Sequence, residues 1–175
     1  MIIIARIQAW AFRSPTKKPV ATSFGIMHDR PAVIVRVEDR EGAFGWGEIW
    51  ANWPAAGAEH RLRLLEMDVA PLVLGAQFAS PIDFFHTLEA QTRIRAVQCG
   101  EIGPFAQVIA GLDMALWDAV AKIEDKPLCA VLAERYGCKA EGLTGYLGPS
   151  VPMERVWVYA AGGYYQPEKD HRKLQ

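Results

Sequence analysis

Apolar and polar residues alternate along the first twelve positions of the chain, MIIIARIQAWAF. An alternation with a period of two is typical of a β-strand that buries one of its two faces. One set of positions carries Arg6 and Gln8, so the other set is predicted to face the core. That second set consists of Ile3, Ala5, Ile7, Ala9 and Ala11.

The same alternation returns over residues 31–38, PAVIVRVE, where valines occupy every second position. Gly42 follows in the turn-forming sequence EDREG, and residues 43–50, AFGWGEIW, predict the returning strand of a hairpin. Residues 13–30 are rich in turn formers and lack a period, which predicts a mobile loop with room for a short strand inside it. The first half of the chain is therefore predicted to form a small antiparallel β-meander.

From Gly57 onward the apolar residues follow a helical period. Ser80, with Pro81 after it and Asp83 three residues on, is a strong signal for a helix start, because serine caps the first turn and proline suits its first position. A run of helices after a meander predicts an α+β domain. The expected helices cover about residues 57–74, 80–98, 103–123 and 127–135.

The helix predicted after Gly103 sets charged residues among apolar ones in AGLDMALWDAVAK, residues 110–122. At ~100° per residue, two adjoining faces of this helix are apolar and only a narrow polar strip remains. Asp118 and Lys122 lie four residues apart on that strip and are predicted to pair. Asp113 falls between the two apolar faces, where a carboxylate needs a partner, so we interpret it as a structural anchor bonded to a neighbouring loop. The polar strip consists of Gln107, Gly111, Asp118 and Lys122.

Composition excludes several classes of function. The 19 Lys and Arg residues nearly balance 20 Asp and Glu, whereas nucleic-acid binding requires a basic face. No apolar run approaches the ~20 residues of a membrane span, and the opening segment is too short for a secretory signal. Cys99, Cys129 and Cys138 show no C-x-x-C spacing, so we expect reduced thiols in a cytoplasmic protein that binds neither nucleic acid nor membrane.

Three segments carry a resemblance to a known family. Residues 110–132, AGLDMALWDAVAKIEDKPLCAVL, closely resemble the signature helix of the mandelate racemase and muconate-lactonizing group of the enolase superfamily. Residues 44–50, FGWGEIW, resemble that family's Gly-Trp-Gly-Glu strand ending, and residues 158–165, VYAAGGYY, resemble the strand that begins its barrel. The three segments occur in the family's order.

The resemblance implies two domains. Residues 1–138 would form the family's N-terminal capping domain, an antiparallel β-meander followed by a helical bundle. Residues 139–175 would hold a linker and the first strand and loop of a truncated (β/α) barrel. Capping loops at about 14–30 and 50–57 would lie over the barrel mouth and help to choose a carboxylate-bearing substrate, an acid sugar or hydroxy acid. The substrate-binding candidates are Phe24, His28, Trp50, Asn52, Trp53, Tyr164 and Tyr165.

Enzymes of this superfamily remove a proton next to a carboxylate with a Lys or His base, while Mg²⁺ stabilises the enediolate. The Lys-x-Lys motif and the acidic metal ligands of similar enzymes lie on later barrel strands. A barrel of this type takes ~200 residues or more, whereas only about 20 remain from Val156 onward. His60, His86 and His171 show no ligand spacing. We therefore expect an inactive fragment with no catalytic residue and no metal site of its own, and Mg²⁺ only in the full-length enzyme.

Two readings of the function remain open. The first is the N-terminal part of a Mg²⁺-dependent acid-sugar dehydratase or racemase, expected to be a homo-oligomer. The second is a free-standing α+β interaction domain that dimerises through its helices and carries no catalysis. An isolated capping domain would expose the second apolar face of the signature helix, so it is expected to associate.

Overall fold

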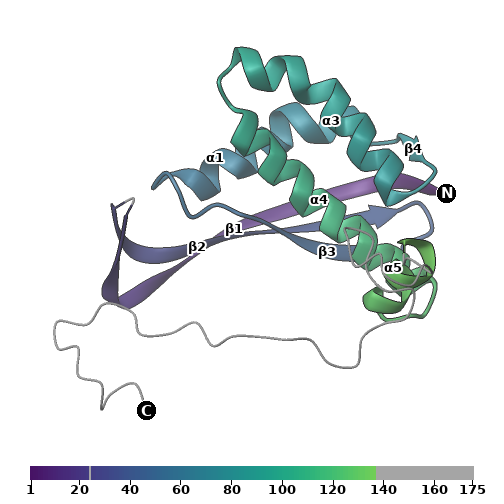
Figure 1. Ribbon diagram of the computed structural model, residues 1–175, viewed down its shortest axis with the longest axis horizontal. Helices are drawn as coiled ribbons and strands as arrows, with labels where there is room; N and C mark the ends of the chain where they lie inside the picture. Colours follow the sequence, from purple (N-terminus) through teal and green to yellow (C-terminus); the bar gives the residue numbers. More distant parts are fainter. Residues whose placement is uncertain (24, 137–175) are drawn as a thin grey trace, which may run out of the picture.

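A four-stranded antiparallel sheet and a layer of helices on one of its faces make up the part of the chain that the computed structural model describes, residues 1–23 and 25–136 (Figure 1). The α+β prediction is confirmed. The predicted barrel strand and the boundary near residue 138 lie outside the described residues. In chain order the elements are β1 (Ile2–Thr22), β2 (Gly25–Asp39), β3 (Phe44–Ile49), α1 (Gly57–Leu64), the π-helix η1 (Leu65–Val69), α2 (Ala70–Val73), β4 (Gln77–Phe78), α3 (Pro81–Gln98), α4 (Ile102–Ile123) and α5 (Leu128–Tyr136).

The strands lie in the order β3-β2-β1-β4. Val33, Val35 and Val37 of β2 are fully buried beneath the helices, as their alternation predicts. Gly42 supplies a φ of +86° in the turn between β2 and β3, a conformation that glycine adopts without steric cost. The short strand β4 was not predicted, because two residues are too few to show a period. It pairs with the first residues of β1.

A β-bulge near the start of β1 corrects the predicted burial pattern. The pairing advances from Ile4 opposite Asp39 to Arg6 opposite Glu38, so one extra residue of β1 is inserted at Ala5. The insertion shifts the parity of the strand, so Ile4 is buried whereas Ala5 is exposed. Residues of opposite parity on the two sides of the bulge therefore reach the same core. They are Ile2 and Ile4 before it and Ile7, Ala9 and Ala11 after it.

The mobile loop predicted for residues 13–30 is wrong. Residues 13–22 and 25–30 instead extend β1 and β2 into a long two-stranded projection, here called the hairpin arm, which reaches beyond the helices (Figure 1). Its pairing is interrupted between Pro15 and Val20 and resumes up to the tip. Most of its side chains are exposed or half-buried, so no buried face imposes the alternation that marks the rest of each strand.

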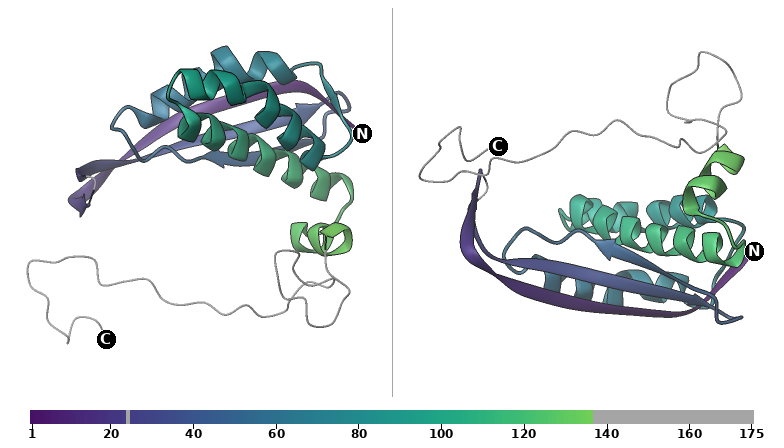
Figure 2. Two further views of the ribbon diagram at one scale, coloured as in Figure 1. Left: turned by 45° about the horizontal axis from the view of Figure 1, so that its top comes forward. Right: turned by 90° about the horizontal axis from the view of Figure 1, so that it is seen from below.

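Helix α4 packs directly on β3 because both surfaces carry glycine at the contact. A Cβ atom at Gly47 would lie 2.0 Å from the carbonyl oxygen of Gly111, and one at Gly45 would lie 2.0 Å from that of Ala115. A Cβ atom at Gly111 would lie 2.4 Å from the Ile49 side chain. The views in Figure 2 show α4 running along the sheet on the face that the other helices also cover. Backbone therefore meets backbone here, which no other residue type allows.

This contact also corrects the predicted polar strip of α4. Gly111 is buried, whereas Ile123, which was placed on the inner face, is 54% exposed at the end of the helix. Ala106, Ala110 and Met114 of the second apolar face are exposed among the described residues. The helical period located the inner face correctly, but it could not show that a glycine would serve as a packing surface.

The start of α3 follows the predicted capping arrangement. The Ser80 hydroxyl accepts a hydrogen bond from the backbone N–H of Asp83 at 3.1 Å, and the Asp83 carboxylate accepts one from the N–H of Ala79 at 2.9 Å. Pro81 occupies the first turn. This reciprocal pair satisfies two backbone donors that a helix start leaves open. None of the helices in the described part of the chain combines the length and apolar character needed to cross a membrane.

Candidate functional site

The hairpin arm meets the segment that joins β3 to α1, residues 50–56, here called the connecting loop. The indole of Trp53 lies against the tip of the arm, since a Cβ atom at Gly25 would come within 3.1 Å of its ring. Gly25 also has a φ of +145°, which L side chains rarely adopt. Two regions that are separate in the sequence thus form one surface at the end of the sheet.

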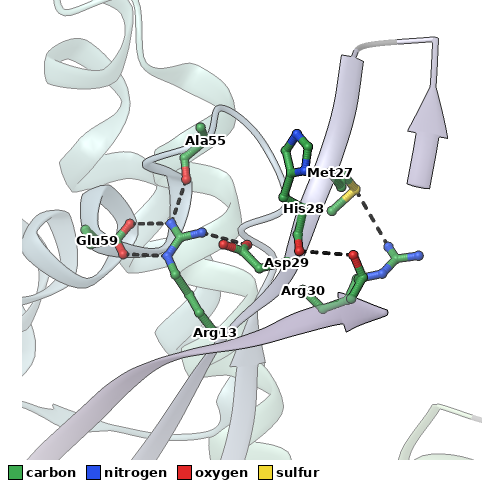
Figure 3. A network of polar contacts seen from close by, with 8 residues as sticks. Arg13, Met27, His28, Asp29, Arg30, Ala55 and Glu59 are labelled. Carbon is green, nitrogen blue, oxygen red and sulfur yellow. Dashed lines mark hydrogen bonds and ion pairs between the residues drawn. The ribbon is translucent and has the colours of Figure 1, made fainter. Parts of the chain in front are cut away.

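Arg13 joins the arm, the connecting loop and α1 through a single guanidinium group (Figure 3). Its Nε and Nη2 donate to the two carboxylate oxygens of Glu59 at 2.8 and 2.6 Å. Nη1 donates to Asp29 at 2.9 Å, and Nη2 also donates to the carbonyl oxygen of Ala55 at 2.6 Å. A bidentate contact of this kind fixes the orientation as well as the distance of the two groups.

The network sets one guanidinium between two carboxylates, those of Asp29 and Glu59. The hydrogen bonds from Arg13 lower the pKa of the Glu59 carboxyl to about 2, and the two carboxylates beside Arg13 raise its own pKa above the ordinary value. Each of its nitrogens already donates to Glu59, Asp29 or Ala55, so the guanidinium links α1, the arm and the connecting loop. Its donor nitrogens are therefore already used within the protein and do not form an anion-binding site.

A recess of about 120 Å³ lies between the arm and the connecting loop. His28 from β2 and Asn52 and Trp53 from the loop line it together with the apolar Ile26 and Met27. Three of the candidates from the sequence are thus brought to one place. Trp50 is 48% exposed and lies outside the recess lining. The candidates Phe24, Tyr164 and Tyr165 lie outside the described residues.

A second arginine reaches the connecting loop from the inner side. Arg61 of α1 is 4% exposed, and its Nη2 donates to the carbonyl oxygen of Trp53 at 3.1 Å. Its Nε donates to Gln107 of α4 at 2.8 Å, and Nη1 lies 3.3 Å from Nδ1 of His60. Burial lowers the pKa of Arg61 from its ordinary value, an effect that the nearby Glu101 carboxylate opposes.

Neither arginine was predicted from the sequence to belong to this site, although each continues an apolar series of its element. Arg13 follows the parity of Ala9 and Ala11 along β1. Arg61 follows Ala58 and precedes Leu65 at helical spacing on the buried stripe of α1. An arginine in an otherwise apolar series indicates a polar partner nearby, and at the buried Arg61 an unpaired charge would be costly.

The charged residues of α4 hold positions away from this recess. The Asp118 carboxylate accepts hydrogen bonds from the backbone N–H of Trp46 at 2.8 Å and from Nζ of Lys122 at 2.6 Å. Asp113 is half-buried, and desolvation raises its pKa while a hydrogen bond with Trp117 opposes the rise. Within the described residues, the hydrogen-bond partner of Asp113 is Trp117, one turn further along the same helix.

A metal site would require several oxygen, nitrogen or thiolate ligands to converge. Within residues 1–23 and 25–136, His, Cys, Asp and Glu side chains form no group of three or more that could hold an ion. The described residues thus present no converging ligand set for the Mg²⁺ that the family resemblance implies.

The four-stranded antiparallel sheet with its helices matches the N-terminal capping domains of enolase-superfamily structures. Residues 6–133 match the family model described as the mandelate racemase / muconate lactonizing enzyme, N-terminal domain. The chain therefore belongs to this family.

Similar proteins of known structure or name support this assignment. The crystal structure of a mandelate racemase/muconate lactonizing enzyme from Bordetella bronchiseptica RB50 is 51% identical, with a TM-score of 0.67 over 75% of this chain and 33% of that one. An enolase from Bradyrhizobium, complexed with magnesium and mandelic acid, is 28% identical, with a TM-score of 0.60 over 74% of this chain and 34% of that one.

Curated relatives have two further activities. An o-succinylbenzoate synthase of Geobacillus kaustophilus is 30% identical over 85% of this chain. An N-succinyl-L-Arg/Lys racemase of Bacillus cereus is 30% identical over 76% of this chain. The chain spans 38% of the first relative's length and 34% of the second's.

Proposed function

We propose that the described domain caps the active site of a Mg²⁺-dependent enzyme that removes a proton next to the carboxylate of an acid sugar or hydroxy acid. The observation that carries the proposal is the recess between the hairpin arm and the connecting loop, on a domain whose family is known. Names of similar proteins support the chemistry, since one relative is a racemase and another structure contains magnesium and mandelic acid, a hydroxy acid. Both a dehydratase and a racemase begin with such a proton removal, so both activities are compatible with these names.

In this proposal the domain lines the substrate-binding site and supplies no group that takes part in the chemical step. Trp53 and Asn52 lie beside His28 in the recess, where a bulky indole can exclude water and the two polar side chains can select among substrate hydroxyl groups. Arg13 already donates to partners on three elements and stabilises the wall. Magnesium, bound by residues outside the described domain, would supply the electrostatic stabilisation of the anion formed by proton removal.

Isotope exchange tests the proposal directly. Residues 6–133 would replace the matching domain of the Bordetella bronchiseptica relative, and loss of the proton next to the carboxylate would be followed by ¹H NMR in D₂O over a panel of acid sugars and hydroxy acids. We expect exchange with Mg²⁺ present, and Trp53→Ala is expected to change which acids react. Met67→Ala is the matched control, because Met67 is 72% exposed and lies outside the recess lining. An identical acid preference with Trp53→Ala would remove the recess from the active site.

The chain by itself is proposed to be inactive and to bind no Mg²⁺. Calorimetric titration of Mg²⁺ into the 175-residue chain checks this, and we expect no binding heat. Stoichiometric binding would mean that acidic residues interpreted here as structural form a metal site. A cytoplasmic location and a homo-oligomeric state stay predictions.

The alternative function, an α+β domain that associates without catalysis, has one observation in its favour. A hollow of about 320 Å³ with a mostly apolar lining runs between α3 and α4, and Val97 and Ile102 beside it are 58% and 61% exposed. Light scattering of the chain distinguishes the readings when combined with the exchange experiment. A stable dimer whose domain supports no exchange in the chimera would favour association as the function.

A further inference from the structure

Four successive carbonyl groups of the connecting loop each accept a hydrogen bond. The carbonyl oxygen of Pro54 accepts from the N–H of Gly57 at 2.7 Å, and that of Ala56 accepts from the N–H of His60 at 3.0 Å, as a helix start requires. The other two, Trp53 and Ala55, have side-chain donors in place of backbone ones. Those donors are arginines from different elements.

Arg61 approaches from the core side of the loop. Its 4% exposure means that the guanidinium has exchanged water for its protein partners almost completely. Besides the Trp53 carbonyl, it donates to Gln107, and its contact with His60 continues to Glu101, which lies 2.9 Å from Nε2 of His60. The loop is thereby tied to α4, the helix that packs on the sheet.

Arg13 approaches from the side of the arm. Its donation to Ala55 lies only two residues from the carbonyl held by Arg61, so the two arginines flank Pro54. Arg13 itself lies on β1, and its partners Asp29 on β2 and Glu59 on α1 fix the guanidinium. Any displacement of the arm would therefore be transmitted to the loop.

We propose that Arg61 and Arg13 are positioning residues that set the place of Trp53 and Asn52 at the recess before any ligand binds. The benefit of this positioning for a substrate rests on the proposed function. The positioning itself is a property of the connecting loop and its two arginines. A loop fixed at four carbonyls loses little conformational freedom when a ligand arrives, which favours binding and orientation. A surface loop of ordinary composition lacks such fixation and would have to be ordered by the ligand.

Lysine provides the discriminating substitution. Arg61→Lys keeps the charge but places all its donors on one nitrogen, and so removes the planar fork that bonds Trp53 and Gln107 at the same time. Arg63→Lys is the matched control on the same helix, because Arg63 is an exposed residue paired with Glu66 at 2.9 Å. Gln107→Met is a second variant that removes the Nε partner of Arg61 without altering any group of the loop.

The experiment is ¹⁹F NMR of the 175-residue chain labelled with 5-fluorotryptophan, with the Trp53 signal assigned by its loss in Trp53→Phe. We expect Arg61→Lys to shift or broaden the Trp53 signal and to leave those of Trp10 and Trp46 in place. Gln107→Met should produce a smaller change of the same kind, and Arg63→Lys none. Circular dichroism confirms that each variant is folded.

An unchanged Trp53 signal in folded Arg61→Lys and Gln107→Met chains would overturn the proposal and leave Arg61 with a purely stabilising role. Equal changes at Trp10, Trp46 and Trp53 would overturn it too, because they would indicate a general loosening of the domain. The measurement contains no substrate or metal. Failure of the proposed enzymatic function would therefore appear in the isotope-exchange experiment and leave this result unaffected.

Discussion

The backbone N–H of Trp46 donates to the carboxylate of Asp118 at 2.8 Å, across 72 positions of the sequence. Trp46 belongs to β3, which among the described strands has a neighbour on one side only, and Asp118 belongs to α4. The carboxylate thus occupies a donor that an edge strand would otherwise offer to another chain. Asp118, which was predicted from the sequence to pair with Lys122, therefore also bonds α4 to the sheet.

Asp118→Ala is expected to lower the free energy of unfolding by about 1 to 2 kcal/mol, because the N–H of Trp46 loses a charged acceptor. Urea unfolding followed by circular dichroism measures the change. Lys122→Ala is the control, with an expected loss below about 0.5 kcal/mol for an exposed pair four residues apart on a helix. Equal losses in the two variants would contradict the role given to the Trp46 contact.

Gly47→Ala is expected to destabilise the domain by about 3 kcal/mol or more, or to prevent folding, since overpacking against backbone has no cheap relaxation. The added Cβ atom would meet the carbonyl oxygen of Gly111 at 2.0 Å. Gly103→Ala serves as the control, because a Cβ atom there would meet nothing within 4 Å. We expect that variant to be neutral or slightly more stable, as measured by thermal unfolding. A Gly47→Ala chain with an unchanged midpoint would show that α4 can move away from β3.

The ion pair of Arg13 and Glu59 predicts a dependence of stability on pH. The pKa of Glu59 falls from about 4.5 in the unfolded chain to about 2 in the folded one, so its contribution is fully present above pH 4.5 and is lost as the pH falls through about 2. Glu59 is an exposed residue, and exposed pairs are worth about 1 kcal/mol or less. The difference in unfolding free energy between the parent and Glu59→Gln should therefore be small at pH 7 and vanish near pH 2. A difference that grows on acidification would have the wrong sign.

Asp113 predicts the opposite dependence. Burial raises the pKa of this carboxyl in the folded chain, so its charged form costs stability at pH 7, and the cost disappears below the unfolded pKa. Asp113→Asn is expected to raise the thermal midpoint at pH 7 and to leave it unchanged at pH 3. Asp113→Leu, which also removes the bond with Trp117, is expected to impair folding or the docking of α4 against another domain. A lower midpoint for Asp113→Asn at pH 7 would show that the charged form is needed within the described domain.

The features predicted correctly from the sequence are those that depend on near neighbours. The valine alternation of β2 and the cap of α3 by Ser80 each involve contacts within a few residues or a single buried face. Local patterns record such contacts directly. The segments 44–50 and 110–132 predicted the family by their resemblance, and the match over residues 6–133 confirms it.

The features missed from the sequence depend on distant partners or on missing side chains. The arm was taken for a mobile loop because exposure on both faces removes the period of two. Arg13 and Arg61 find carbonyl partners in the connecting loop, and Arg61 also bonds Gln107, 46 residues away. The bulge at Ala5 reverses the parity of β1 without any glycine or proline to mark it.

The alternation within β3 has a consequence for how the chain avoids misfolding. Gly45 and Gly47 face α4, and the residues between and before them are Trp46 and Phe44. A slip of one residue in the pairing of β2 with β3 would turn indole and phenyl rings toward a helix that leaves room only for hydrogen atoms. The slipped hairpin could form, but α4 could not dock on it. Docking of α4 therefore selects the correct register of β2 and β3, because only the correctly paired strands can bind the helix.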